Sequence, residues 1–330
     1  MWTADRWKDY EVIDCSSGEK LERWGKWLLV RPDPQVIWAT PKENRGWQTP
    51  AGRYHRSSRG GGEWEFHGLP KEWEISYELA VRGGCASESR EAEPADPARG
   101  FSDPAPVQSR GMTPRSEGRR LTFRLKPFSF KHTGLFPEQA ANWDWFSGLI
   151  QDAVKSGREV KVLNLFAYTG GATIAAAAAG AAVTHVDASR GMVLWAKENA
   201  QISGLEDAPI RWLVDDCVKF VRREIRRGSR YDAIIMDPPS YGRGPKGEIW
   251  KIEDAVYPLV KDCTELLSDD PLFFLMNSYT TGLQASVLSY LLGSLVVPEK
   301  GGRVEADEIG LPVTESRLIL PCGAAGRWVK

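Results

Sequence analysis

The sequence lacks the features that mark several other classes of protein. Its five cysteines are odd in number and widely spaced, and no pair forms a Cys-x-x-Cys motif, so neither a disulfide framework nor a metal site is predicted. No run approaches the ~18 apolar residues needed to span a bilayer. The first residues also lack the apolar core of a signal peptide. These absences predict a cytoplasmic protein with no membrane segment and no bound metal.

An excess of charge of one sign is also missing. The chain of 330 residues carries 43 basic and 44 acidic side chains, which nearly cancel. Net charge therefore gives no evidence for a nucleic-acid partner, although basic residues gather at 119–131 and 222–227. The second group is typical of a solvated helix face. The length allows two domains or one large one.

The first part of the chain has short strand-like segments separated by clusters of Gly, Pro, Asp and Asn, which predict a small antiparallel sheet. These segments are Tyr10–Asp14, Trp27–Arg31, Val36–Ala39, Trp64–Phe66 and Trp73–Ala80. Residues 85–118 have few large apolar side chains, so we expect a disordered insertion there. It separates two alternating strands, 73–80 and 120–126, that form a hairpin. We therefore predict a small β-rich domain over residues 1–128.

From residue 129 onward, predicted strands and helices alternate, which indicates an α/β fold with a parallel sheet covered on both faces. A helix is predicted over 138–156, and later helices at 172–179, 190–203, 216–227, 252–268 and 281–295. Strands are predicted at 160–166, 183–187, 210–214, 231–236, 271–277, 302–308 and 315–321. The last two strands have no helix between them, so they should form a hairpin with one antiparallel strand.

A glycine turn, Ala167 to Gly171, joins the first of these strands to a helix of small residues. Backbone N–H groups at such a turn can bind the carboxylate of a methionine moiety. The dinucleotide motif Gly-x-Gly-x-x-Gly is missing because Ala167 and Thr169 occupy its first two glycine positions, which counts against a dehydrogenase. Asp187 ends the second strand, where an acid accepts hydrogen bonds from ribose hydroxyls.

Acidic residues follow the next two strands as well. Asp215 and Asp216 come where an adenine amino group is bound, although Asp also caps helices, so one of the pair can cap while the other binds. Asp237, Pro238 and Pro239 end the fourth strand at the crevice of the sheet. Because proline fixes φ and removes donors, the carbonyls there are expected to stay unpaired.

Together these motifs resemble the S-adenosylmethionine-dependent methyltransferases of the large-subunit ribosomal RNA cytosine-methylating type. The resemblance covers about 120–330, and its matching segments are 131–139, 162–170, 186–189, 215–216 and 236–239. It implies a seven-stranded class I methyltransferase (Rossmann-like) sheet over 129–330, S-adenosyl-L-methionine as cofactor and RNA as partner, as in rRNA processing. The family's N-terminal RNA-binding barrel is expected to be absent.

The resemblance also adds a Thr-Gly-x-Phe loop that closes over the cofactor. The expected cofactor-binding residues are Thr133, Phe136, Gln139, Asn164, Phe166, Ala167, Tyr168, Thr169, Gly170, Asp187, Ala188, Ser189, Asp215 and Asp216. The expected catalytic residues are Asp237, Pro238 and Pro239, with Ser240 and Tyr241 against the substrate, where Tyr241 can stack on a flat ring.

One departure from the family concerns the nucleophile. Methylation of cytosine C5 needs a cysteine thiolate that adds to C6, but the two positions where related enzymes carry it hold Ser240 and residues 276–279, Met-Asn-Ser-Tyr. We therefore expect an acceptor nitrogen or oxygen of RNA. A protein or small-molecule methyltransferase and a non-catalytic S-adenosylmethionine-binding module remain open alternatives.

Overall fold

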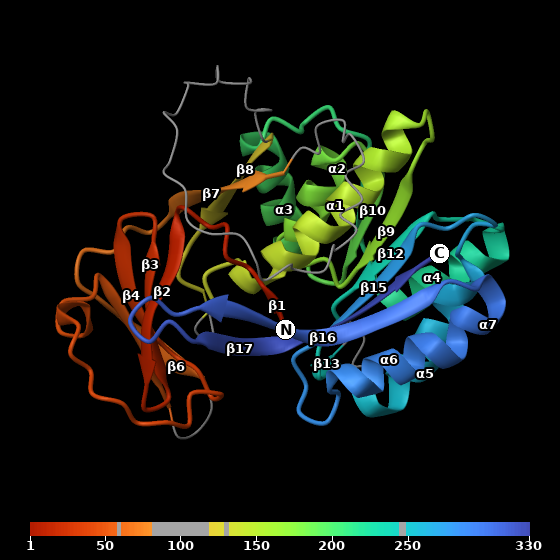
Figure 1. Ribbon diagram of the computed structural model, residues 1–330. Helices are drawn as coiled ribbons and strands as arrows, with labels where there is room; N and C mark the ends of the chain where they lie inside the picture. The colour runs from red at the N-terminus through yellow and green to blue at the C-terminus, as the bar shows by residue number, and fades with distance from the viewer. Residues whose placement is uncertain (58–60, 81–118, 129–131, 244–248) are drawn as a thin grey trace, which may run out of the picture.

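The structure is a computed structural model that describes residues 1–57, 61–80, 119–128, 132–243 and 249–330. The insertion expected at 85–118 lies outside the described residues. A large sheet with helices on both faces fills one side of the molecule, and a smaller sheet lies beside it (Figure 1).

The large sheet has eight strands in the order β1-β16-β17-β15-β12-β9-β10-β11. Its strands are β9 (Lys161–Leu165), β10 (Ala182–Asp187), β11 (Ile210–Val214), β12 (Ala233–Met236), β15 (Phe273–Ser278), β16 (Arg303–Pro312), β17 (Ile319–Val329) and the short β1 (Trp2–Thr3). The neighbours β11, β10, β9, β12 and β15 pair in parallel, and β17 is antiparallel to both β15 and β16. The predicted fold class is therefore confirmed, with β1 as an unforeseen edge strand.

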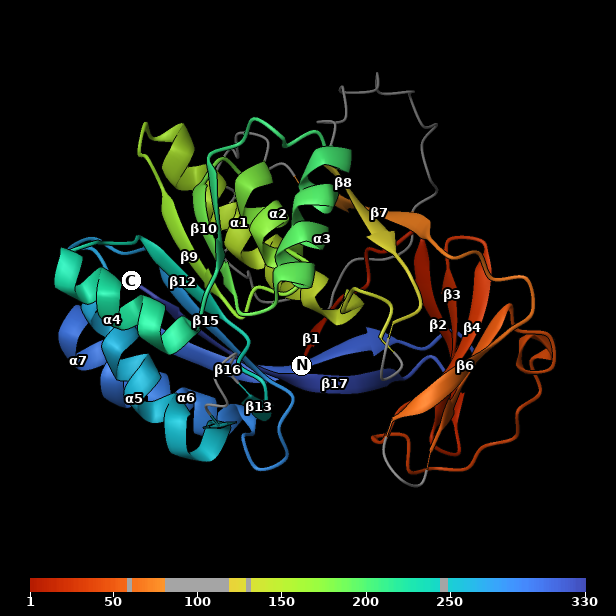
Figure 2. The same ribbon diagram turned by 180° about the vertical axis from the view of Figure 1, so that it is seen from behind.

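Helices cover both faces of this sheet (Figure 2). One face carries α1 (Ala140–Lys155), α2 (Gly171–Ala178) and α3 (Arg190–Ile202), and the other carries α4 (Cys217–Arg227), α5 (Ile252–Glu265), α6 (Ala285–Leu295) and α7 (Val297–Lys300). Side chains of the central strands alternate between two large apolar cores: Val162 belongs to one and Leu163 to the other. Burial on both faces explains the continuous apolar runs in these strands.

The smaller sheet differs from the expected antiparallel one. Its strands are β2 (Tyr10–Ser16), β3 (Glu19–Trp24), β4 (Trp27–Pro32), β5 (Gly52–Arg56) and β6 (Gly62–Phe66), and β4 pairs with β5 in parallel. The strand predicted at Val36–Ala39 is wrong. Backbone N–H groups of Ser17 and Gly18 bond to the carbonyls of Trp38 and Val36, which holds this segment as a loop along the β2–β3 turn.

Two further hairpins, β7 (Trp73–Leu79) with β8 (Arg119–Leu125) and β16 with β17, were predicted from the sequence. The predicted pairing of 73–80 with 120–126 is confirmed by β7 and β8, which are antiparallel and pack on α1, α2 and α3. The final strand was predicted at 315–321 but runs over Ile319–Val329, and residues beyond β16 bond to β2 through the Val12 carbonyl. The domain division near residue 128 stays a prediction.

Candidate functional site

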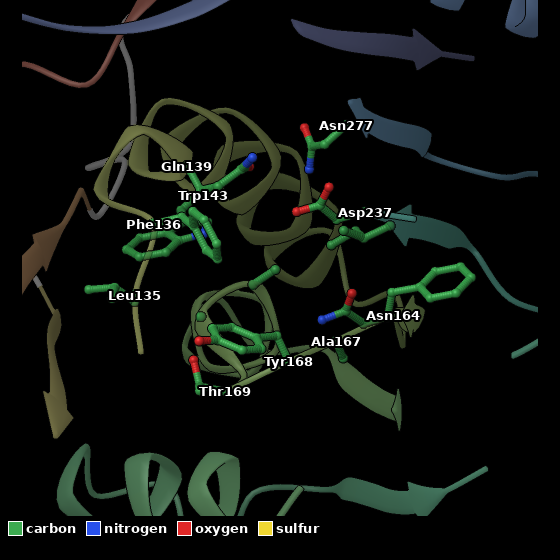
Figure 3. A pocket seen from close by; sticks show the side chains of 14 residues that line it. Leu135, Phe136, Gln139, Trp143, Asn164, Ala167, Tyr168, Thr169, Asp237 and Asn277 are labelled. Atoms are coloured by element: carbon green, nitrogen blue, oxygen red, sulfur yellow. The ribbon is translucent and has the colours of Figure 1, made fainter. Parts of the chain in front are cut away.

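The carboxyl ends of β9, β10, β12 and β15 meet at one edge of the large sheet, and two cavities open there. The inner cavity has an open volume of about 460 Å³ and the outer cleft one of about 1230 Å³. Phe136, Phe166, Tyr168 and Asp237 line both, so the two spaces adjoin. In Figure 3, Asp237, Asn164 and Asn277 lie around the inner cavity with Phe136, Gln139 and Trp143 across from them.

The turn after β9 has an unusual backbone. Phe166 and Tyr168 have φ angles of 55° and 51°, in the left-handed region that residues with a side chain seldom adopt. Gly170 follows with φ 86°, and a Cβ there would lie 2.9 Å from Cβ of Ala196. The absence of a Cβ at Gly170 therefore allows α2 to approach α3 closely. The strained backbone at Phe166 and Tyr168 indicates a ligand site, because such strain persists only where the surroundings enforce it and it gathers at such sites.

Asp187 at the end of β10 holds this turn in place. Its carboxylate accepts hydrogen bonds from the backbone N–H of Tyr168 at 2.9 Å and of Ser189 at 2.8 Å. Burial raises the pKa of Asp187, and the two N–H donors oppose that rise. Each carboxylate oxygen has a second lone pair, so Asp187 can still accept hydrogen bonds from a ligand in the outer cleft, which it lines with Ala188 and Ser189.

Buried polar groups without a partner suggest where a ligand would bind. The hydroxyls of Tyr168 and Thr133 are buried and have no hydrogen-bond partner among the described residues, which is rare for buried groups. Tyr168 lines both cavities, and burial raises its pKa to about 12. Beneath them Asn164 donates to Thr173 at 2.9 Å, which contacts buried His185. Asn164 also lines the inner cavity.

The structure separates the two neighbouring acids after β11. Asp216 caps α4 by accepting from the Lys219 N–H at 2.8 Å, and it lines the outer cleft. Asp215 forms an ion pair with Arg223 and accepts from the Asp216 N–H, and it lines neither cavity. Asp216 thus both caps α4 and lines the outer cleft, and Asp215 does neither.

Asp237 stands between the two cavities. Burial, and to a smaller extent the charge of Glu138, raises the pKa of its carboxyl to about 7. Glu138 is itself buried, and burial raises its pKa as well. A carboxyl with a pKa near 7 exchanges a proton readily at neutral pH, which is a property of acid–base groups at active sites.

Most of the predicted site residues line one of the two cavities. Those that do are Phe136, Gln139, Asn164, Phe166, Ala167, Tyr168, Thr169, Asp187, Ala188, Ser189, Asp216, Asp237, Pro238, Pro239 and Ser240. Those that do not are Thr133, Gly170, Asp215 and Tyr241. Thr133 lies in the loop before α1 and Gly170 in the turn between β9 and α2. Tyr241 is 51% exposed.

Sequence reasoning missed several residues of the site. Tyr279, next to the end of β15, accepts a hydrogen bond from Gln139 at 2.7 Å, and Asn277 accepts one from Asn142 at 3.0 Å. Their place at the end of β15, the strand beside β12, was a usable signal. Trp250 also lines the outer cleft, but it is eleven residues past Pro239, and no motif marks it.

The cysteines with described positions are poorly suited to form a thiolate. Cys217 lines the outer cleft, yet it is buried, and burial raises the pKa of its thiol. Burial likewise raises the thiol pKa values of Cys263, within α5, and of Cys322, near the start of β17. Cys15 lies in β2 of the smaller sheet, and its thiol pKa is raised as well.

The described ranges contain neither a metal-binding cluster nor a membrane-spanning helix. Within those ranges, no three His, Cys, Asp or Glu side chains gather as a group able to hold a metal ion. Likewise, none of the helices in the described part is both long enough and apolar enough to cross a membrane.

Comparison with known proteins identifies the fold. Residues 115–268 match the family model of S-adenosylmethionine-dependent methyltransferases. The crystal structure of an S-adenosylmethionine-dependent methyltransferase from Agrobacterium tumefaciens is 33% identical with a TM-score of 0.78, and the match covers 97% of this chain and 90% of that one. The chain therefore belongs to the S-adenosylmethionine-dependent methyltransferases. It is a methyltransferase, and S-adenosylmethionine is its cofactor.

Two curated relatives are ribosomal RNA methyltransferases by name. Ribosomal RNA large subunit methyltransferase K/L of Shewanella frigidimarina is 32% identical over 148 residues, 44% of this chain and 20% of that protein. Ribosomal RNA large subunit methyltransferase K of Neisseria meningitidis is 32% identical over 120 residues, 36% of this chain and 34% of that protein. The matched part thus spans only a fifth to a third of these relatives.

Proposed function

We propose that this enzyme methylates RNA at a nitrogen or oxygen atom, without a covalent cysteine intermediate. One observation carries the proposal: the strained turn after β9 and the Asp237-Pro238-Pro239 turn line the same outer cleft. A cofactor site and an acceptor site that adjoin in this way support direct transfer by positioning. The names of the two ribosomal RNA relatives support RNA as the substrate.

The cofactor side of the cleft is assigned as follows. The N–H groups of Ala167, Tyr168 and Gly170 bond within the protein, so those of Thr169 and Gly171 are assigned to the methionine carboxylate. Asp187 accepts from the ribose hydroxyls, and Asp216 accepts from the adenine amino group. The loop of Thr133, Phe136 and Gln139 packs over the cofactor. The Tyr168 hydroxyl, which has no partner in the described part of the chain, fits a polar ligand here. When bound, S-adenosylmethionine supplies an electrophilic methyl group.

The acceptor side is assigned to Asp237 and its neighbours. As the carboxylate, Asp237 accepts a hydrogen bond from the acceptor and can take up a proton that leaves it, because its pKa of about 7 matches that task. Ser240 lies next to this position and bonds to Thr280 at 2.6 Å. A serine hydroxyl is a much weaker nucleophile than a thiolate, so no covalent step is assigned to it.

A methyl-transfer assay tests the proposal. The protein would be incubated with tritiated S-adenosylmethionine and with deproteinised total RNA or RNA-free protein extract, both from cells that lack the gene. We expect label in RNA, and mass spectrometry of nucleosides would identify the product. Label that enters only protein or small molecules would contradict an RNA substrate. The cytoplasmic location remains part of this proposal.

A further inference from the structure

Trp250 reaches the outer cleft through a short hairpin. It lies in β14 (Ile249–Lys251), which pairs with β13 (Tyr241–Arg243), so that Trp250 is opposite Gly242. The strand β13 starts two residues after Pro239, and the hairpin therefore folds back over the Pro-Pro turn. No motif in the sequence assigns a role to this residue.

The indole of Trp250 makes two contacts at the turn. Its N–H donates a hydrogen bond to the carbonyl of Pro239 at 2.6 Å, and its ring lies 5.2 Å from that of Phe166, centre to centre. Trp250 is half-buried and lines the outer cleft. One edge of the indole is thus fixed by the protein, while part of the side chain stays accessible in the cleft.

The hydrogen bond from Trp250 affects which protein groups can bind the molecule that accepts the methyl group. The Pro239 carbonyl, expected to be unpaired, already has a donor in Trp250. One of its two lone pairs is thereby used, and the Asp237 carboxyl, which lines the same cleft, is the other acceptor available for polar recognition. The hydrogen bond also stiffens the turn that carries Asp237, two residues before Pro239.

A second group of aromatic side chains lines the cleft. The Phe136 ring lies 5.6 Å from that of Tyr279 and 5.7 Å from that of Tyr168, and all three residues line the outer cleft. Tyr279 is 38% exposed. Aromatic side chains at an accessible cleft suit a flat ring, because stacking on a base is strong and tolerates any base. A ribose ring is not flat and gains little from such surfaces.

We infer that Trp250 is a specificity-determining residue that stacks on an unpaired RNA base, so that the methyl group goes to the base and not to a ribose hydroxyl. The inference rests on the proposed function and narrows its substrate. A base within a duplex cannot enter such a cleft, so the target nucleotide is single-stranded or flipped out.

The test compares Trp250→Leu and Trp250→Phe with the wild-type protein on deproteinised total RNA from cells that lack the gene. Trp250→Leu loses the stacking ring, so KM for RNA should rise about tenfold or more. Trp250→Phe keeps a ring but lacks the N–H, so KM should stay within about threefold while kcat falls, because the Pro239 turn is no longer tied. Calorimetry with S-adenosylhomocysteine, expected to give a near wild-type Kd, checks folding of both variants.

Trp64→Leu is the matched control. Trp64 also donates its indole N–H to a carbonyl, that of Phe128 at 3.0 Å, but it lies in β6 and does not line the cleft. We expect its KM for RNA to equal that of the wild type. An equal rise in KM for Trp64→Leu and Trp250→Leu would overturn the inference, because the effect would not be specific to the cleft.

The position of the label gives an independent result. Acid hydrolysis of the labelled RNA separates bases from ribose, and we expect the methyl group with the bases. Label in ribose, or an unchanged KM in Trp250→Leu, overturns the role of Trp250 while the RNA methyltransferase function stands. If the wild-type protein labels no RNA, the proposed function fails and this inference fails with it.

Discussion

The carboxylate of Asp187 accepts a hydrogen bond from the backbone N–H of Tyr168 at 2.9 Å, which ties the end of β10 to the strained turn after β9. One acid therefore shapes the turn and also faces the cleft where the cofactor is proposed to bind. Substitution of Asp187 should accordingly affect both the ligand and the local backbone.

Asp187→Ala should weaken S-adenosylmethionine binding on the order of 30- to 150-fold, because a pair of charge-assisted hydrogen bonds of roughly 2–3 kcal/mol is lost. Calorimetry measures this change. Asp187→Asn, which keeps one carbonyl oxygen and the side-chain shape, should lose less. Unchanged affinity in Asp187→Ala would remove the ribose assignment.

Asp237→Ala should slow methyl transfer and leave cofactor affinity nearly intact, since the carboxyl is assigned to the acceptor. If the carboxylate form is the active one, wild-type kcat/KM should rise with pH up to about 7, following the raised pKa of Asp237. Asp237→Asn, similar in shape but unable to ionise, should lose that pH dependence. A variant that binds the cofactor poorly but keeps kcat would place Asp237 on the wrong side of the cleft.

The same pKa predicts a dependence of stability on pH. Because the pKa of Asp237 is about 7 in the folded protein and 3.8 as the ordinary value, the folded state binds more protons between these pH values. The free energy of unfolding therefore falls as pH rises from about 4 to 7. Asp237→Asn should remove this penalty, so its free energy of unfolding should exceed the wild-type value at pH 8 by at most about 4 kcal/mol and match it near pH 4.

Denaturant titrations of both proteins at the two pH values would measure the difference. Equal stability of Asp237→Asn and wild type at pH 8 would show that the Asp237 carboxyl ionises in the folded protein as easily as in water.

No covalent enzyme–RNA adduct should form when the protein is incubated with S-adenosylmethionine and RNA containing 5-fluorocytosine. Cys217 lines the cleft, but its raised thiol pKa leaves little thiolate at neutral pH. A denaturant-resistant band that shifts with RNA length would contradict this expectation. Loss of such a band in Cys217→Ser or Cys322→Ser would identify the attacking thiol.

Deletion of residues 88–116 with a short Gly-Ser turn in their place should change the melting temperature little. The hairpin is paired up to Leu79 and Arg119, so a short turn can close it. Shortening a flexible loop favours folding by about 0.6 kcal/mol per halving of its length. A large fall in melting temperature on calorimetry would show that the deleted residues pack on the rest of the protein.

The elements of the large sheet, and the strand ends that carry Asp187 and Asp237, could be predicted from the amino-acid sequence alone. Apolar runs long enough for a buried strand, each followed by a turn and a helix, leave few other topologies. The carboxyl ends of parallel strands meet at one edge, so the proximity of these acids followed from chain order alone. The final strand was misplaced because small and charged residues inside it, such as Gly323 and the buried Arg327, interrupt the apolar pattern.

Features that depend on contacts between distant segments could be seen only in the folded protein. It separated Asp216, in the cleft, from Asp215, which Arg223 holds outside it. It also placed β1 beside β16, and Trp250 against the Pro239 carbonyl. Local sequence patterns cannot predict such contacts, because the same residue type can cap a helix, form an ion pair or line a cleft. Only the fold determines which partner each side chain meets.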